Sequence, residues 1–251
     1  MSNRKMNRAL RFLRFVLRPI LMLLTKRDWR GAENFPDGGF VLVANHISHL
    51  DPFTFAHFCI DHGIPPRYLA KATVLDLPVV GRLFRSTGQI PVYRGTATAA
   101  GAYSAAVEAV NDGACIIIYP EGTITRDQNL WPMGGKTGAA RVALATGRPV
   151  VPAAQWGAHE VLAPYARRVS LYPRKTVHVR AGPPVDLDDL RGQPPTAELL
   201  AEATDRIMDA IAAELADIRR QPVPSERISL KDPRARQRPN TRRKPRKTKE
   251  S

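Results

Sequence analysis

The chain has 251 residues, of which 43% are hydrophobic, so it can bury one substantial core. Its net charge of +15 at first suggests a nucleic-acid-binding protein, but the charge lies at the two ends: residues 1–30 carry +8, residues 219–251 carry +10, and the part between them carries −3. The two cysteines and six histidines follow none of the common metal-ligand spacings, which excludes the familiar metal-site motifs and suits a reducing compartment.

Residues 1–30 predict an amphipathic, basic helix. The stretch Leu10–Leu24 is rich in apolar residues, but three arginines and a proline interrupt it, so it is a poor candidate for a membrane span. On a helical wheel the arginines fall within an arc of about 120° and face an apolar side. The arginines are Arg4, Arg8, Arg11, Arg14 and Arg18, and the apolar side holds Leu10, Leu13, Val16 and Leu17. We predict that this helix lies on an anionic membrane surface; the alternative is that it packs on the protein's own core.

Residues 31–220 alternate apolar extended runs with helical patterns. The predicted strands are 40–44, 68–70, 90–93, 115–119, 150–155 and 176–181, and the predicted helices are 52–62, 98–111, 135–146 and 196–220. This alternation predicts a single layered α/β domain with a mixed, largely parallel central sheet flanked by helices. Beyond it, five prolines among Arg, Lys and Ser predict a disordered basic tail over residues 221–251.

The run Asn45–Asp51, with the sequence NHISHLD, follows the first of these strands. His46 and Asp51 are five residues apart, so they can meet only if the chain turns between them, because neither a helix nor a strand would place them on one face. Asp51 and Pro52 have the pattern of a helix N-cap followed by proline, which supplies such a turn. The two side chains would then form an imidazole–carboxylate dyad for general-base catalysis. The alternative is a packed histidine beside an ordinary helix cap.

Further charged residues follow other predicted strands or begin a predicted helix. They are Arg94 in GQIPVYR, Glu121 and Arg126 in YPEGTITR, and Lys136. The carboxyl ends of parallel strands meet at one edge of a sheet, and arginine or a helix N-terminus suits phosphate, so we predict an anion-binding cleft beside His46. Each residue taken alone is equally compatible with a surface charge or a turn. The GGKT sequence at residues 134–137 lacks the first glycine of a phosphate-binding loop, so we reject an NTPase.

Four segments together, within about residues 31–185, resemble the lysophospholipid and glycerophosphate acyltransferase family. NHISHLD, GQIPVYR, YPEGT and PVVP match its four sequence blocks in order. The resemblance implies that His46 is the general base and that Asp51 orients it. It also implies that the blocks holding Arg94 and Glu121, with Gly122 and Thr123, bind the acceptor; Arg126 and Lys136 are further candidate cations. The chain departs from the family at Arg126, which stands two residues later than the arginine that usually ends the third block.

The resemblance implies transfer of a fatty acyl group from acyl-CoA or acyl carrier protein to a lysophospholipid hydroxyl. The first choice of acceptor is 1-acylglycerol 3-phosphate, which would give phosphatidic acid, and the alternatives are glycerol 3-phosphate or a lyso-glycolipid. We expect direct transfer without an acyl-enzyme, and neither a cofactor nor a metal. His49 and Ser48 are second choices for the chemistry.

A lipid-facing enzyme with basic flanks is expected peripherally on the cytoplasmic face of the cell membrane, in contact with anionic lipids. The alternative outside enzymes is a basic membrane-surface or nucleic-acid-binding protein. Residues 220–251 contain no aromatic residue for base stacking, and the body of the chain is slightly acidic, which argues against nucleic acid as a partner.

Overall fold

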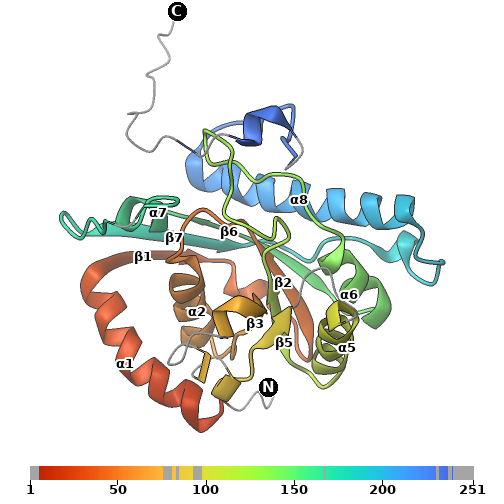
Figure 1. Cartoon of the computed structure of the whole chain (residues 1–251), viewed down its shortest axis with the longest axis horizontal. Coiled ribbons are helices and arrows are strands. Elements are labelled where there is room, and N and C mark those ends of the chain that lie inside the picture. The colour runs from red at the N-terminus through yellow and green to blue at the C-terminus, as the bar shows by residue number, and fades with distance from the viewer. Residues whose placement is uncertain are drawn as a thin grey trace, which may run out of the picture.

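A seven-stranded sheet forms the centre of the computed structural model, which describes residues 6–75, 81–82, 85–92, 98–166, 168–229, 232–236 and 239 (Figure 1). The strands are β1 (Thr25–Arg30), β2 (Phe40–Ala44), β3 (Arg67–Lys71), β4 (Ile90–Val92), β5 (Cys115–Ile118), β6 (Val150–Trp156) and β7 (Lys175–Ala181). They lie in the order β1-β7-β6-β2-β5-β3-β4. Among the pairings of these seven described strands, only that of β6 with β7 is antiparallel, so the prediction of a mixed, largely parallel sheet is confirmed.

Helices flank this sheet, as predicted. They are α1 (Arg8–Leu24), α2 (Asp51–Asp61), α3 (Ala72–Leu75), α5 (Thr98–Asn111), α6 (Gly138–Thr146), α7 (Ala158–Val161) and α8 (Ala197–Arg219). Short 3-10 turns cover Ala32–Asn34, Asp188–Leu190 and Pro233–Arg236. Each of the six strands predicted from the sequence lies within one residue of its expected bounds, and the four predicted helices of the body are also present.

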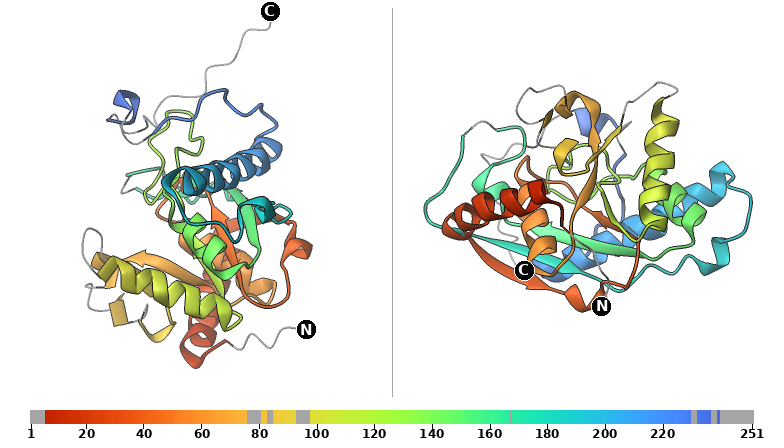
Figure 2. Two further views of the ribbon diagram at one scale, coloured as in Figure 1. Left: turned by 90° about the vertical axis from the view of Figure 1, so that its right-hand side faces the viewer. Right: turned by 90° about the horizontal axis from the view of Figure 1, so that it is seen from below.

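The central strand β2 shows why the apolar runs become strands of a buried sheet. All five of its residues are fully buried, and successive side chains point to opposite faces. Phe40, Leu42 and Ala44 pack in the core layer under α2. Val41 and Val43 pack in the opposite layer, whose apolar side chains come from α5, α6 and α8. The sheet therefore has a core on both faces, and Figures 1 and 2 show helices on either side of it.

The N-terminal region differs from the predicted helix over residues 1–30. Helix α1 ends at Leu24, where the Thr25 hydroxyl donates a hydrogen bond of 2.7 Å to the Leu21 carbonyl. Residues 25–30 instead form β1, a sheet-edge strand parallel to β7. An edge strand exposes much of its surface and therefore tolerates polar residues. The sequence of β1, TKRDWR, is largely polar and carries no apolar pattern that would predict a strand.

Helix α1 carries apolar side chains on two sides. Leu10 and Leu21 are buried against the body, which agrees with the alternative that the helix packs on the protein's own core. The opposite side is exposed and also apolar; it comprises Phe12, Phe15, Val16, Ile20 and Leu23. Within the described residues, no helix combines the length and hydrophobicity needed to cross a bilayer.

Residues 221–229 and 232–236, which belong to the segment predicted as a disordered tail, lie on the body in the structure. Ile228 and Ala235 are buried with Met133 in a small apolar cluster, and the Gly134 N–H donates to the Ile228 carbonyl at 2.8 Å. Single apolar residues among prolines and arginines give no periodic signal, so the sequence does not reveal this contact. Residues 240–251 lie outside the described part of the chain.

Candidate active site

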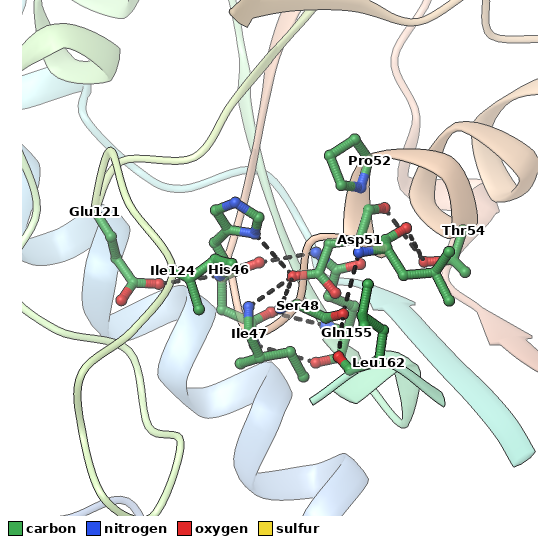
Figure 3. Close-up of polar contacts among 12 residues, drawn as sticks. His46, Ile47, Ser48, Asp51, Pro52, Thr54, Glu121, Ile124, Gln155 and Leu162 are labelled. Atoms are coloured by element: carbon green, nitrogen blue, oxygen red, sulfur yellow. Dashed lines mark hydrogen bonds and ion pairs between the residues drawn. The ribbon is translucent and has the colours of Figure 1, made fainter. Parts of the chain in front are cut away.

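His46 and Asp51 meet at the carboxyl end of β2, as predicted (Figure 3). The Nδ1 atom of His46 lies 2.8 Å from Oδ2 of Asp51. The same carboxylate oxygen accepts hydrogen bonds from the backbone N–H groups of Ile47, at 2.6 Å, and Ser48, at 2.7 Å. The chain therefore makes the turn that the five-residue spacing requires, and the hydrogen bonds to the Asp51 carboxylate hold this turn together.

The local role expected of Asp51 in helix α2 is not the one observed. The helix begins at Asp51, Leu50 is its N-cap, and no side chain caps it. The Asp51 carboxylate points back into the preceding loop and binds the donors there. The prediction that Asp51 is the N-cap of the helix is wrong, although the turn that it was invoked to supply is present.

The His46 ring is held in one orientation. Asp51 is fully buried, whereas the His46 side chain keeps 16% of its surface exposed. The imidazole stacks on the Tyr119 ring with 4.4 Å between centroids, and Tyr119 stacks in turn on Tyr68 at 6.1 Å. Because Nδ1 faces Asp51, the other ring nitrogen, which points away from the carboxylate in Figure 3, is the one that can accept a proton.

Glu121 binds backbone donors from both sides of the site. Its Oε1 accepts from the His46 N–H and its Oε2 from the Met133 N–H, each at 3.0 Å. The side chain is fully buried. Burial raises the pKa of the carboxyl to about 8, and the two backbone donors oppose that rise. Through these two hydrogen bonds Glu121 joins the loop after β5 to the loop that carries His46.

The rest of the YPEGT segment lies directly beside the histidine loop. The Thr125 N–H donates to the His46 carbonyl at 2.8 Å. Gly122 has φ +66°, a left-handed conformation that favours glycine, and its N–H donates to the Tyr119 carbonyl at 2.9 Å. Thr123, next in the same turn, is half-buried. Gly122 and Thr123 are therefore placed within the loop that lines the candidate site.

The predicted cations are placed differently from one another. The Arg126 guanidinium donates to the Ala235 carbonyl at 3.3 Å, so in this structure it contacts the C-terminal segment. Lys136 is exposed, and its N–H donates to the Pro120 carbonyl at 2.9 Å, two residues before α6 begins. Arg94 lies outside the described residues.

One pair of residues at the site was not singled out from the sequence. The Asn45 and Gln155 side chains join the ends of β2 and β6 immediately before His46. The Gln155 N–H donates to Asn45 Oδ1 at 2.8 Å, and the Gln155 side-chain amide donates to the Asn45 carbonyl at 2.9 Å. The available signal was an amide residue at the end of each of two apolar strands, where a buried polar side chain needs a specific partner.

Comparison with known proteins gives a consistent result. Residues 26–156, just over half of the chain, match the model of the family described as Acyltransferase. The chain belongs to the Acyltransferase family. It is 32% identical over 140 residues to the 1-acyl-sn-glycerol-3-phosphate acyltransferase BAT2 of Brassica napus, covering 55% of this chain and 39% of that protein. It is 34% identical over 125 residues to the 1-acyl-sn-glycerol-3-phosphate acyltransferase of Salmonella typhimurium, covering 48% of this chain and 47% of that protein. The matches therefore span about half or less of the length of these relatives.

The fold also matches that of a solved acyltransferase. The crystal structure of PlsC, the 1-acyl-sn-glycerophosphate acyltransferase of Thermotoga maritima, aligns with a TM-score of 0.62 and 24% identity, over 82% of this chain and 79% of that one. At this identity the likeness concerns the fold. It confirms the predicted α/β class, and the family match confirms the resemblance carried by the four sequence blocks.

In this member of the Acyltransferase family, the second choices for catalysis lack the required geometry. The Ser48 hydroxyl is buried and donates to the Leu162 carbonyl at 2.6 Å. His49 is exposed, and the centroid of its ring lies 6.4 Å from that of the Tyr165 ring. Cys59 and Cys115 are both buried free thiols. Within the described residues, no group of three or more His, Cys, Asp or Glu side chains is placed to hold a metal ion.

Proposed function

We propose that the chain transfers a fatty acyl group from acyl-CoA or acyl carrier protein to the free hydroxyl of a lysophospholipid. The proposed acceptor is 1-acylglycerol 3-phosphate, and the product is phosphatidic acid. The observation that carries this proposal is the His46–Asp51 dyad at the end of β2 in a chain of the Acyltransferase family. The names of its relatives support the choice of acceptor.

The proposed reaction is a direct transfer. Neutral His46 accepts the proton of the acceptor hydroxyl as the oxygen attacks the thioester carbonyl. The resulting oxyanion collapses, the carbon–sulfur bond breaks, and the thiolate takes the proton from the imidazolium. Asp51, bound to Nδ1, keeps the other ring nitrogen free of a proton before the attack and stabilises the imidazolium after it. The Ser48 hydroxyl donates to the Leu162 carbonyl and not to a general base, which supports direct transfer over an acyl-serine intermediate.

An apolar groove supports a lipid substrate. It lies between α1 and α2 and is open to solvent. Its walls include Leu10, Leu13, Leu17, Phe53, Ile60 and Tyr68. Tyr68 also belongs to the ring stack that reaches His46 through Tyr119. We propose that an acyl chain of the donor or acceptor lies in this groove, with its reacting end toward His46.

The acceptor's phosphate needs cations, and we propose Arg94 and Lys136 for this role, with Gly122 and Thr123 lining the same loop. Arg126 would join them only after leaving the Ala235 carbonyl. Helix α1, with its exposed apolar side and its arginines, is proposed to hold the enzyme peripherally on the anionic cytoplasmic face of the cell membrane.

The test is acyl transfer by the purified full chain with labelled acyl-CoA or acyl carrier protein. The acceptors are 1-acylglycerol 3-phosphate, glycerol 3-phosphate, a lyso-glycolipid and a lysophospholipid without a free phosphate. We expect the highest rate of acyl transfer with 1-acylglycerol 3-phosphate as the acceptor. In His46→Ala this rate should fall by at least about 10³-fold.

His49→Ala is the matched control, because it removes an exposed imidazole three residues away. Cys59→Ala and Cys115→Ala should likewise retain transfer. Turnover by His46→Ala at the rate of the unaltered chain would disprove the assignment. Vesicle binding without transfer to any acceptor would favour the non-enzyme alternative, a basic membrane-surface protein.

A further inference from the structure

Seven consecutive exposed residues, 168–174, form a loop between α7 and β7, called here the β7 loop. Three of its side chains are large and apolar or aromatic: Val169 is 57% exposed, Leu171 44% and Tyr172 91%. Such side chains gathered in one solvent-exposed loop, without a partner from the protein's core, are typical of an interaction surface.

The charge of this region identifies the kind of partner. Residues 161–175 contain four basic residues and no acidic one. Arg168 and Arg174 stand at the two ends of the β7 loop and flank its apolar residues. Aliphatic side chains that enter hydrocarbon, a tyrosine at the interface and arginines beside it are complementary to an anionic bilayer surface.

The β7 loop lies beside the end of α1. The Arg174 guanidinium donates to the Met22 carbonyl at 2.6 Å and to the Thr25 carbonyl at 2.8 Å, so it caps carbonyl groups at the C-terminus of that helix. Leu23, which is 72% exposed, is the last apolar residue of the outer side of α1. Figure 1 and the right-hand view of Figure 2 show the loop next to this helix end.

The segment that leads into the β7 loop is attached to the candidate active site. The Leu162 carbonyl accepts the Ser48 hydroxyl at 2.6 Å, and the Tyr165 hydroxyl donates to the Ile124 carbonyl at 2.7 Å. These bonds reach the two loops that hold His46 and Glu121. The connection from α7 to β7 therefore runs from the active-site loops to the end of α1.

We propose that the β7 loop is a second membrane-contact element, which inserts Val169, Leu171 and Tyr172 into an anionic bilayer beside α1. The proposal rests on the membrane attachment proposed above for α1. Contact at two places fixes the angle of the body on the membrane, and the bonds from Leu162 and Tyr165 then fix the active-site loops relative to the bilayer.

The first experiment measures binding of the purified full chain to phosphatidylcholine vesicles with and without phosphatidylglycerol. Leu171→Ser/Tyr172→Ser should weaken binding to the anionic vesicles about tenfold, because two side chains that enter the bilayer on binding are replaced by polar ones. Val223→Ser is the matched control, since Val223 is 43% exposed and lies beyond α8. Phe15→Ser/Leu23→Ser should weaken binding through α1 independently.

The second experiment locates the loop in the bilayer. In Tyr172→Trp, brominated acyl chains should quench the added fluorescence, whereas Val223→Trp should show only the quenching of the chain's own tryptophans. Unquenched fluorescence in Tyr172→Trp, or anionic-vesicle binding by Leu171→Ser/Tyr172→Ser equal to that of the unaltered chain, would overturn the proposal. A change in oligomer size with unchanged vesicle binding would overturn it in favour of a protein interface.

A third readout separates this proposal from the enzymatic one. Acyl transfer to 1-acylglycerol 3-phosphate embedded in vesicles should fall with binding in Leu171→Ser/Tyr172→Ser, while transfer between water-soluble short-chain substrates should not change. If the chain transfers no acyl group at all, the vesicle and quenching results still decide the role of the loop.

Discussion

At the scale of single residues, Asp51 has two tasks that use one oxygen atom. Its Oδ2 accepts from His46 Nδ1 and from two backbone N–H groups, so the carboxylate both closes the turn and orients the imidazole. The carboxylate is fully buried, so these three donors, and not water, must stabilise its charge. The identity of the dyad could be predicted from the spacing, but the backbone donors could not, because they depend on how the loop closes.

Replacing Asp51 with asparagine should separate these tasks. In Asp51→Asn the amide oxygen can take the place of Oδ2 and accept the same three hydrogen bonds, but the negative charge that stabilises the imidazolium is lost. We expect kcat to fall about 10²- to 10⁴-fold with little change in KM. Steady-state kinetics will test this, with Asp37→Asn, an exposed aspartate, as the control. An unchanged kcat in Asp51→Asn would show that the dyad does not contribute to catalysis.

Glu121 should make stability depend on pH. Its pKa is about 8 in the folded chain and is raised from 4.5 mainly by burial. Between these values the unfolded chain releases its proton while the folded chain keeps it, so a rise in pH favours unfolding. The free energy of unfolding should therefore fall by up to about 1.4 kcal/mol per pH unit in this window, and the fall should end above about pH 8.

The measurement is denaturant unfolding at a series of pH values for the unaltered chain and for Glu121→Gln, which cannot titrate at this position. The difference in free energy of unfolding between the two proteins should change in favour of Glu121→Gln as the pH rises from about 5 to 8. A difference that stays constant over this range would mean that Glu121 is ionised throughout.

At the scale of elements, Asp61 at the end of α2 ties down the N-terminal region. Its carboxylate binds Arg18 of α1 at 2.8 Å and Arg27 of β1 at 3.4 Å. His57, one turn earlier on α2, lies 3.5 Å from the same carboxylate. The arginines that the sequence assigned to a lipid-facing side therefore include one, Arg18, that is turned toward the protein.

We expect Asp61→Asn to loosen α1, because Arg18 and Arg27 lose their common anion. Hydrogen exchange followed by mass spectrometry should show faster exchange of the amides of α1, with the exchange of β2 unchanged. Asp112→Asn, which removes an exposed carboxylate at the end of α5, should leave α1 as it is. Equal exchange of α1 in both variants would show that the helix is held by its apolar contacts alone.

Strand β2, which is buried on both of its faces, is an element that the sequence predicts well. Strand β2 is an unbroken apolar run, and its bounds agree with the prediction. Strand β1 was missed because it lies at the sheet edge, where polar residues are tolerated. Glu121 could be placed at the site from the sequence, but the contacts of its carboxylate could not be predicted. They are made with backbone donors from other loops, not with its neighbours in sequence.

At the scale of the whole molecule, the C-terminal segment is a structural part of the body. Ile228 and Ala235 cover Met133, whose N–H binds Glu121. We therefore expect that a chain ending at Arg220 loses about 2 kcal/mol of stability, through exposure of this cluster, and also loses part of its acyl transfer. A chain ending at Pro239 should keep both properties.

Thermal unfolding and acyl transfer, measured on both shortened chains, will check this expectation. Both truncations remove the six basic residues between 242 and 249, so the chain ending at Pro239 is the control for the loss of these residues. Equal losses in the two chains would assign the effect to the basic residues and contradict the structural role of residues 221–236.

The position of β1 has a consequence for how the chain is made. Its hydrogen-bonding partner is β7, so residues about 150 apart, such as Asp28 and His178, must meet to complete the sheet edge. A ribosome needs on the order of ten seconds to synthesise that length of chain. During this interval the outer apolar side of α1 is already in solution, joined to a strand that has no sheet to bind. Of the seven strands of this sheet, the one synthesised first is thus among the last to be incorporated.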